Sequence, residues 1–293
     1  MDSGALRPEE EGRHRRGPEP LWGESWYFDF AARDGSLGGF VRFGLYPNQS
    51  AVWYWAALVG HGRRLLLVHD HSMEPPRGAA LEVRGQGLWS AVNCETPHDH
   101  WSIGLEAFAV AMDDPVEAYH GERGDLVGLG FDLEWEATAL PFGGPGEYGQ
   151  ACQVSGEILV GDEQLELDGT GHRGHTWGVQ DWWSAPRSSV SGILDDGTTF
   201  AARDQHGYIS RSPTVEPVAI ERISDANGLP LALAVTLGRL TIDASVVAPA
   251  PLLLESPDGR QARLARALCL YRSTDSEGNA SSGTGWADHS EPG

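Results

Sequence analysis

From Leu21 onward the chain is a succession of short strand-like segments separated by glycine-rich turns. In Ser25–Ala31 every second residue is a large aromatic, and Ala51–Val59 is nearly all apolar. Alternation and short apolar runs bounded by turn residues are typical of β-strands. No window has the 3.6-residue apolar period of a long helix, and one helical turn is expected near Pro115–His120. We therefore predict an all-β protein with less than about 10% helix, against a usual content of about a third.

Regularly spaced strands without intervening helices favour an antiparallel sandwich or barrel. The pattern restarts after residue 180, so each half is an antiparallel unit of barrel size. We expect a disordered N-terminal arm over 1–20, a first domain over 21–178 and a second domain over 179–290. The expected strands are Ser25–Ala31, Gly39–Tyr46, Ala51–Val59, Leu65–His71, Leu88–Glu95, Trp101–Met112, Val127–Ala139, Gln150–Val160, Gln164–Gly169, Ser188–Leu194, Thr199–Gln205, Val215–Ile223, Ala232–Leu237, Leu240–Val247, Gln261–Ser273 and Gly283–His289.

The charge balance limits the partners of the chain. There are 42 acidic and 21 basic residues, the net charge is −21, and every basic residue is an arginine. Such a charge repels phosphate backbones, so nucleic acid is not an expected partner. The absence of lysine excludes Schiff-base chemistry and a P-loop lysine. No segment has the apolar length of a membrane helix or a signal peptide. We expect a cytoplasmic protein without stable membrane insertion, whose oligomeric state the sequence leaves open.

The segment 168–183 combines more ionisable and indole side chains than any other stretch of the chain. Four glycines, two histidines, an arginine and three tryptophans lie within sixteen residues, together with Asp168 and Asp181. We expect the strand before it to end near Gly169 or Gly171 and to continue as an irregular crossover between the two halves. Polar groups held against aromatic surface have shifted pKa values and mark possible sites. The alternative is an inter-domain plug, in which the indoles pack and Arg173 pairs with a buried acid.

Within this segment, Gly171–Gly178 resembles the Arg-Asp-His-Ser-Trp-Gly signature of the AttH and carotenoid 1,2-hydratase (hydroxyneurosporene synthase)-like superfamily. Members of that group commonly continue with an aromatic pair and a Leu-Asp-Asp-Gly hairpin, and Asp181–Trp183 and Leu194–Gly197 stand at those places. The closing Gly283–His289 is similar to the final strand of the superfamily, Gly-x-Gly-aromatic-x-Glu. The resemblance extends over about residues 22–290 in layout. It implies two lipocalin-like (calycin-like) antiparallel β-barrels in tandem.

Two positions depart from the signature: Gly174 replaces the usual aspartate, and Thr176 replaces serine. No role of that aspartate is therefore carried over, whereas His175, Trp177 and Gly178 match. Relatives include hydratases that add water to an isolated alkene and cyclases that shape polyenes. The resemblance implies a cavity for an elongated apolar substrate.

We place the functional centre at the junction of the two halves. His175, Asp181 and Arg173 are the candidate catalytic residues, because an arginine can hold a carboxylate bidentately and a histidine can transfer protons near neutral pH. The candidate substrate-binding residues are His172, Trp177, Trp182, Trp183 and Trp286.

Cofactor sites have little support. His69-Asp70-His71 and His98-Asp99-His100 each place two imidazoles on one face of a strand, which suggests a cupin-like metal centre. The cupin pattern puts a glutamate four or five residues after the second histidine, but Glu74 follows His71 by three. No nucleotide-binding glycine motif precedes a helix. We therefore expect neither a metal nor another cofactor. Four acids of the strand patterns are expected at a rim or on the surface: Glu24, Asp29, Glu95 and Glu106.

The leading hypothesis is a cofactor-independent enzyme of secondary metabolism, acting on a polyene, terpenoid, polyketide or other lipid-like substrate at the domain junction. Its reaction would be that of a lyase (hydratase or dehydratase) or of an isomerase or cyclase. A buried carboxylic acid could stay protonated near neutral pH and protonate an alkene, and indole faces would stabilise the resulting cation. The alternative is a non-catalytic carrier or sensor of an apolar small molecule, and a cupin-like metalloenzyme is third.

Overall fold

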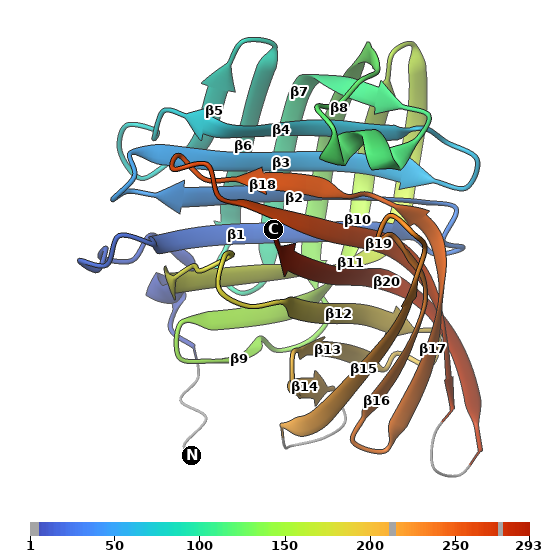
Figure 1. Cartoon of the computed structure of the whole chain (residues 1–293). Coiled ribbons are helices and arrows are strands. Elements are labelled where there is room, and N and C mark those ends of the chain that lie inside the picture. The colour runs from blue at the N-terminus through green and yellow to red at the C-terminus, as the bar shows by residue number, and fades with distance from the viewer. Residues whose placement is uncertain (1–5, 211–214, 275–277) are drawn as a thin grey trace.

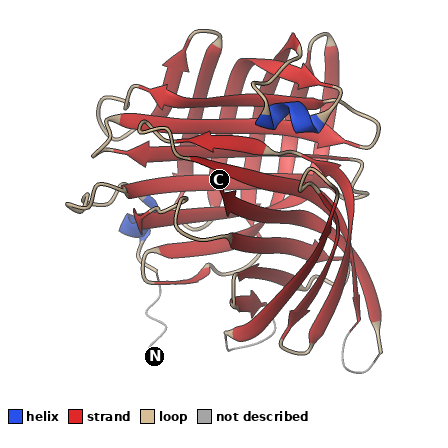
Figure 2. Cartoon of the chain, viewed as in Figure 1, coloured by secondary structure: helices blue, strands red, loops and turns tan. Residues whose placement is uncertain are grey.

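The structure is a computed structural model that describes residues 6–210, 215–274 and 278–293. Strands dominate it, and the described helices are two single 3-10 turns, η1 (Pro8–Glu11) and η2 (Pro115–Tyr119) (Figure 2). The all-β prediction and the expected turn near Pro115 are confirmed. Within the described residues, no helix combines the length and the apolar character needed to cross a membrane.

The first half of the chain forms one antiparallel sheet in the order β4-β3-β2-β1-β11-β10-β8-β7-β6-β5, with β9 on the side of β10 (Figure 1). The additional pairing of β4 with β7 joins the two ends of an eight-strand run, which closes the sheet into a barrel. Its strands are β1 (Trp22–Ala32), β2 (Leu37–Tyr46), β3 (Ala51–Gly60), β4 (Leu65–Met73), β5 (Leu81–Gly85), β6 (Leu88–Thr96), β7 (His100–Met112), β8 (Asp125–Ala137), β9 (Phe142–Gly144), β10 (Glu147–Val160) and β11 (Glu163–Val179).

The second half forms a nine-stranded antiparallel sheet in the order β17-β16-β15-β14-β13-β12-β20-β19-β18. Here the pairing of β17 with β19 closes the strand circuit, and β18 lies outside it. The change of sheet falls between β11 and β12. The strands are β12 (Arg187–Leu194), β13 (Thr199–Arg203), β14 (His206–Ile209), β15 (Glu216–Ser224), β16 (Pro230–Leu237), β17 (Leu240–Pro249), β18 (Leu252–Glu255), β19 (Gln261–Thr274) and β20 (Ala280–Pro292).

The glycine-rich segment is not an irregular crossover. β11 runs unbroken through it to Val179, paired with β1 on one side and with β10 on the other. A side chain at Gly171 would place its Cβ 2.0 Å from the carbonyl oxygen of Asp29, and one at Gly169 would lie 2.2 Å from that of Ala31. The expectation of a break here was therefore wrong, because these glycines permit close approach of neighbouring strands and do not end the strand.

The N-terminal segment is also ordered over 6–20, which corrects the expectation of a disordered arm there; residues 1–5 of the expected arm lie outside the described residues. The Glu11 side chain is buried, and the Arg13 guanidinium donates to the carbonyl oxygens of Gly78 and Ala80 at 2.6 Å each. The segment lies by the start of β1 and the end of β11 (Figure 1). Specific polar contacts order it despite its charged composition.

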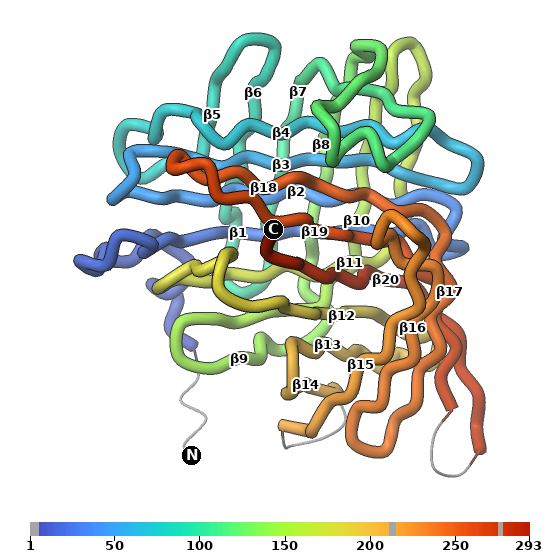
Figure 3. The backbone as a smooth tube through the Cα atoms, in the orientation of Figure 1, coloured from blue at the N-terminus to red at the C-terminus, as the bar shows by residue number. Residues whose placement is uncertain are grey.

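Apolar side chains fill three regions. One is the interior of the first barrel, where Phe28, Trp101 and Trp135 pack ring against ring. Another is the interior of the second barrel. Between them lies a third cluster, made by the outer face of β1–β4 and the strands β17–β20 that cross it (Figure 3). In this junction the ring centroids of Phe40 and Trp286 lie 5.4 Å apart in an edge-to-face arrangement, so the two halves share a continuous core.

Candidate functional site

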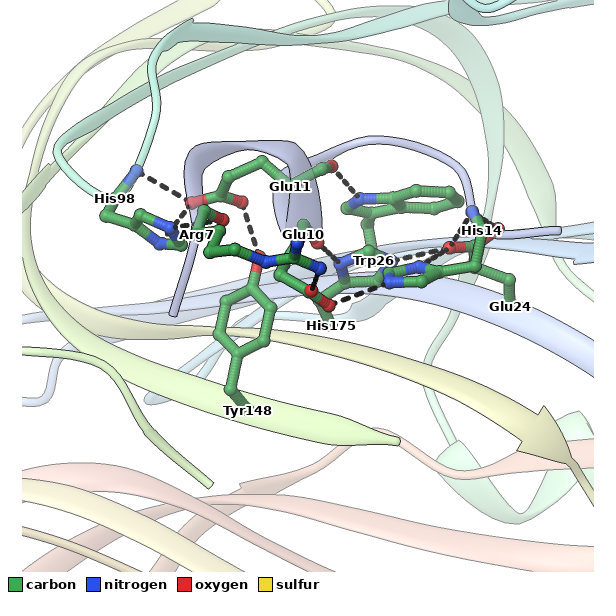
Figure 4. Close-up of polar contacts among 9 residues, drawn as sticks. All are labelled: Arg7, Glu10, Glu11, His14, Glu24, Trp26, His98, Tyr148 and His175. Carbon is green, nitrogen blue, oxygen red and sulfur yellow. Dashed lines mark hydrogen bonds and ion pairs between the residues drawn. The ribbon is translucent and has the colours of Figure 1, made fainter. Parts of the chain in front are cut away.

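The inward face of β11 carries three of the predicted site residues. Arg173, His175 and Trp177 alternate along the strand, and each contacts the N-terminal segment at the mouth of the first barrel. Figure 4 shows His175 beneath that segment. We call the group around them the mouth cluster. Its members are Glu10, Glu11, His14, Glu24, Trp26, Tyr148, Gln150, Arg173, His175 and Trp177.

Arg173 and Glu11 form a buried bidentate ion pair, with N–O distances of 2.7 and 3.0 Å. The Glu11 carboxylate also accepts the Tyr148 hydroxyl at 2.5 Å and the His98 backbone N–H at 2.7 Å. Burial works against the charge of Glu11, but the attraction of Arg173 and these hydrogen bonds outweigh it and lower its pKa. The geometry matches the plug alternative, in which Arg173 pairs with a buried acid.

His175 lies at the centre of the mouth cluster and is fully buried. Its Nε2 is 2.9 Å from Glu24 Oε1, and its ring stacks on Trp26 at 4.4 Å. His14 reaches the same Glu24 oxygen at 2.7 Å and stacks on Trp177 at 3.9 Å. Glu24 is 2% exposed, so the expectation that it lies on a rim or at the surface was wrong.

His172 points to the opposite face of β11 from Arg173 and is likewise buried. Its backbone N–H donates to Asp29 Oδ1 at 2.8 Å, and Ser191 of the second sheet lies 3.5 Å from Oδ2. Burial lowers the pKa of the His172 ring to about 4, so the ring is neutral at physiological pH.

Asp29 is the centre of a second group, which we call the junction cluster: Tyr27, Asp29, Arg266 and Asp288. Arg266 donates to the Tyr27 hydroxyl and forms an ion pair with Asp288 at 3.3 Å. Asp29 is 1% exposed, which corrects the expectation of a rim or surface position. Burial raises its pKa to about 7, although the His172 N–H, Arg266 and Tyr27 favour the charged form.

The remaining predicted residues lie apart from His175 and Arg173. Trp286 is buried in the junction and donates to the Phe30 carbonyl at 3.0 Å. Trp182 and Trp183 follow β11 and pack against the junction core while partly exposed. Asp181 is partly exposed, and its pKa is lowered because its carboxylate accepts the Trp183 N–H at 2.9 Å. The predicted set is therefore divided between the mouth, the junction and the link from β11 to β12.

A family model described as "Domain of unknown function (DUF7064)" matches residues 7–293, which is nearly the whole chain. The chain belongs to this family. The match starts within the N-terminal segment, so the family model includes Glu11 and His14 as well as both barrels. No curated protein sequence matches the chain significantly.

Solved structures with the same fold share little sequence with this DUF7064 chain. An AttH candidate from Nitrosomonas europaea is 15% identical, has a TM-score of 0.65, and aligns over 99% of this chain and 98% of its own. Kievitone hydratase from Nectria haematococca is 12% identical with a TM-score of 0.66, over 98% and 93%. CghA in complex with Sch210972 is 12% identical with a TM-score of 0.58, over 93% and 89%. The expected resemblance to the AttH-like group is confirmed at the level of the fold.

The DUF7064 chain has a cavity of about 240 Å³ in the second sheet. Its wall combines apolar Ile220, Leu233 and Ala287 with Asp288 of the junction cluster. An adjoining, more open region of about 400 Å³ shares Ile220 with it. The volume of the open region lies within the range of ordinary ligand pockets, about 300–1,000 Å³, and that of the cavity lies just below it.

The two His-x-His pairs have other partners. His69 pairs with Glu122, and the partly buried His71 accepts the Trp55 indole N–H at 2.8 Å. His98 contacts Glu11, and His100 contacts Glu134. Among the residues that the structure describes, neither pair belongs to a group of three potential metal ligands. The structure therefore does not assemble the cupin-like centre.

Five residues of the mouth and junction clusters were not predicted from the sequence as site residues: Glu11, His14, Glu24, Tyr27 and Asp29. Glu11 and His14 lie in the segment expected to be disordered. For Asp29 a signal existed, since the alternation in Ser25–Ala31 places it on the same face as Tyr27. That face is buried only because the second sheet covers it.

Proposed function

We propose that the chain is a cofactor-independent enzyme of the hydratase or isomerase type, acting on an apolar small molecule, with Asp29 as the group that transfers the proton. A general acid works best when its pKa lies near the operating pH. Asp29 meets this condition, because burial between the two sheets raises its pKa to about 7. This observation carries the proposal.

In a hydration, the protonated Asp29 would give its proton to an alkene carbon. Water would then add to the carbocation and return a proton to the carboxylate, so the acid is regenerated. In an isomerisation the cation would lose a different proton to the same carboxylate. Indole faces such as that of Trp286 stabilise cations by about 0.5–2 kcal/mol.

The cavity in the second sheet is the proposed route for the substrate. Asp288 lines it, pairs with Arg266, and contributes by its charge to the raised pKa of Asp29. The wall combines apolar side chains with Ser188, Arg222, Asp288 and His289, which suits an apolar molecule that carries a polar group. The similarity in fold to kievitone hydratase and CghA supports the reaction class, and we keep their ligands as probes.

The test uses a panel of prenylated and polyene compounds, including kievitone, incubated with the protein in D2O. Mass spectrometry then detects hydration as added water and isomerisation as deuterium exchange without added water. Replacing Asp29 by Asn keeps the shape and the acceptor for the His172 N–H but removes the transferable proton. We expect turnover to fall at least about 100-fold.

The matched control is Asp168→Asn, an exposed acid on β11 that pairs with Arg33. It should leave turnover unchanged. Equal turnover in Asp29→Asn and in the unmodified protein would refute the role of Asp29. Saturable binding of a panel compound without any conversion would instead favour the carrier alternative.

A further inference from the structure

His14, Glu24 and His175 bring three potential metal ligands together in the mouth cluster (Figure 4). One ligand atom from each lies within 4.8 Å of the other two. The Glu24 and His175 side chains are buried, and the His14 side chain is 21% exposed. The three residues come from the N-terminal segment, β1 and β11, so only the folded chain assembles them.

Both ring nitrogens of His175 face hydrogen-bond acceptors, but a neutral ring carries only one N–H. Its Nδ1 lies 3.0 Å from the Glu10 carbonyl oxygen, which can only accept, so Nδ1 carries a hydrogen. A neutral ring then has a lone pair on Nε2. That lone pair faces Glu24 Oε1, a second acceptor, at 2.9 Å. A proton or a metal ion is needed between them.

His14 has the same deficit. Its Nε2 is 3.1 Å from the Glu10 carboxylate and its Nδ1 is 2.7 Å from the Glu24 carboxylate. The Glu10 carboxylate also accepts a hydrogen bond from Arg7 at 2.8 Å. A neutral imidazole carries one hydrogen for these two contacts. The cluster therefore lacks two hydrogens, and protonating Glu24 would supply only one.

Two protons on the rings would satisfy the contacts but would create two cations whose ring centres are 5.3 Å apart. One divalent ion supplies the same positive charge and binds all three side chains at once. Imidazole nitrogens and a carboxylate oxygen are ligands that zinc uses in proteins.

The surroundings match those of bound metals. A ligating histidine usually donates its other N–H to a carbonyl or a carboxylate, which fixes the ring. Here Glu10 provides both partners, its carbonyl oxygen for His175 and its carboxylate for His14. The backbone N–H of His14 orients Glu24 at 3.0 Å.

We propose that His14, Glu24 and His175 bind one divalent transition-metal ion, of which Zn²⁺ is the best match, with water at the partly exposed fourth position. Ligand atoms around tetrahedral zinc lie about 3.3 Å apart, given bonds of about 2.0–2.1 Å. The contacts to Glu24 are 2.7 and 2.9 Å, so the side chains separate by about half an ångström on binding. This site lies on the face of β1 opposite to Asp29 and does not rest on the proposed function.

The test titrates the full chain, freed of metal with a chelator, with ZnSO4 by isothermal calorimetry. We expect one Zn²⁺ per chain and a higher melting temperature in its presence. His14→Gln and Glu24→Gln should each weaken binding at least about 100-fold, since even loss of an outer hydrogen bond weakens metal affinity by about 10–100-fold. Mg²⁺, which prefers oxygen ligands, should not compete.

The control is His61→Gln, which removes an exposed histidine far from the cluster and should leave Zn²⁺ affinity unchanged. His14 lies outside the barrel walls, so His14→Gln tests the site even if Glu24→Gln fails to fold. The proposal is overturned if Zn²⁺ does not bind saturably, or if His14→Gln binds it as tightly as the unmodified chain does.

Discussion

Glu11 and Asp29 are both carboxylates removed from solvent, yet their environments act in opposite directions. Arg173 pairs with no other carboxylate that the structure shows than Glu11, and this pairing lowers the pKa of Glu11. Asp29 has no such partner, because Arg266 is shared with Tyr27 and Asp288, and its pKa rises to about 7. Burial alone therefore does not identify an acid that can transfer protons. The pKa of a buried carboxylate also depends on whether the nearest cation pairs with it or with other groups.

The two carboxylates also differ in role, Glu11 being structural and Asp29 chemical. The Glu11–Arg173 pair joins residues 162 positions apart and fastens the N-terminal segment in the barrel mouth. A carboxylate fixed in its charged form binds well but transfers no proton near neutral pH. Asp29 populates both protonation states there. We therefore propose that the Glu11–Arg173 pair anchors the N-terminal segment and that proton transfer belongs to the junction.

The largest effect on stability is expected for Arg173→Met, which leaves Glu11 buried without a cation. We expect a loss of about 3–5 kcal/mol in the free energy of unfolding, since an uncompensated buried charge is costly. Urea denaturation measures it. The exposed pair of Arg33 with Asp168 is the control, and Arg33→Met should cost at most about 1 kcal/mol. A loss below 1 kcal/mol in Arg173→Met would show that the pair does not hold the segment.

The pH dependence of stability tests the junction. The folded protein keeps a proton on Asp29 up to about pH 7, whereas an unfolded aspartate loses it near 3.8. The unfolded state thus binds fewer protons in that interval, so this group makes stability fall as pH rises from about 4 to about 7 and contributes no slope above it. The fall amounts to at most about 4 kcal/mol.

Asp29→Asn should remove this part of the pH dependence. Urea denaturation of both proteins at several values between pH 4 and 8 gives the comparison, with Asp168→Asn as the exposed control. If Asp29→Asn and the unmodified chain lose stability in parallel as the pH rises, then Asp29 does not hold its proton in the folded state.

A smaller loss of stability is expected when the hydroxyl group of Tyr148 is removed. Tyr148→Phe removes the hydroxyl that donates to Glu11 at 2.5 Å and keeps the ring. Hydrogen bonds to charged groups contribute about 1.5–3 kcal/mol. We expect a loss in that range by urea denaturation, and a loss below about 0.5 kcal/mol for Tyr208→Phe on the second sheet. Equal effects of the two substitutions would mean that the Tyr148 hydroxyl does not stabilise the charge of Glu11.

Most of the fold could be predicted, because alternation and turn residues are local signals. Four short strands were missed, since each has too few residues for a pattern of its own: β5, β9, β14 and β18. The candidate site was harder. The two histidines and the arginine of β11 stood out by their chemistry, but the partner of each comes from elsewhere in the chain.

What the sequence determined by itself is the all-β architecture, the restart of the pattern after β11 and the inventory of ionisable groups on that strand. Strand periodicity and turn chemistry act between near neighbours, so they can be read along the chain. The tertiary structure alone decided that Glu11 and His14 enter the barrel mouth and that Asp29 is covered by the second sheet. Burial and the distance to a counter-charge depend on surfaces brought together from distant segments, and these two quantities set the pKa of a carboxylate.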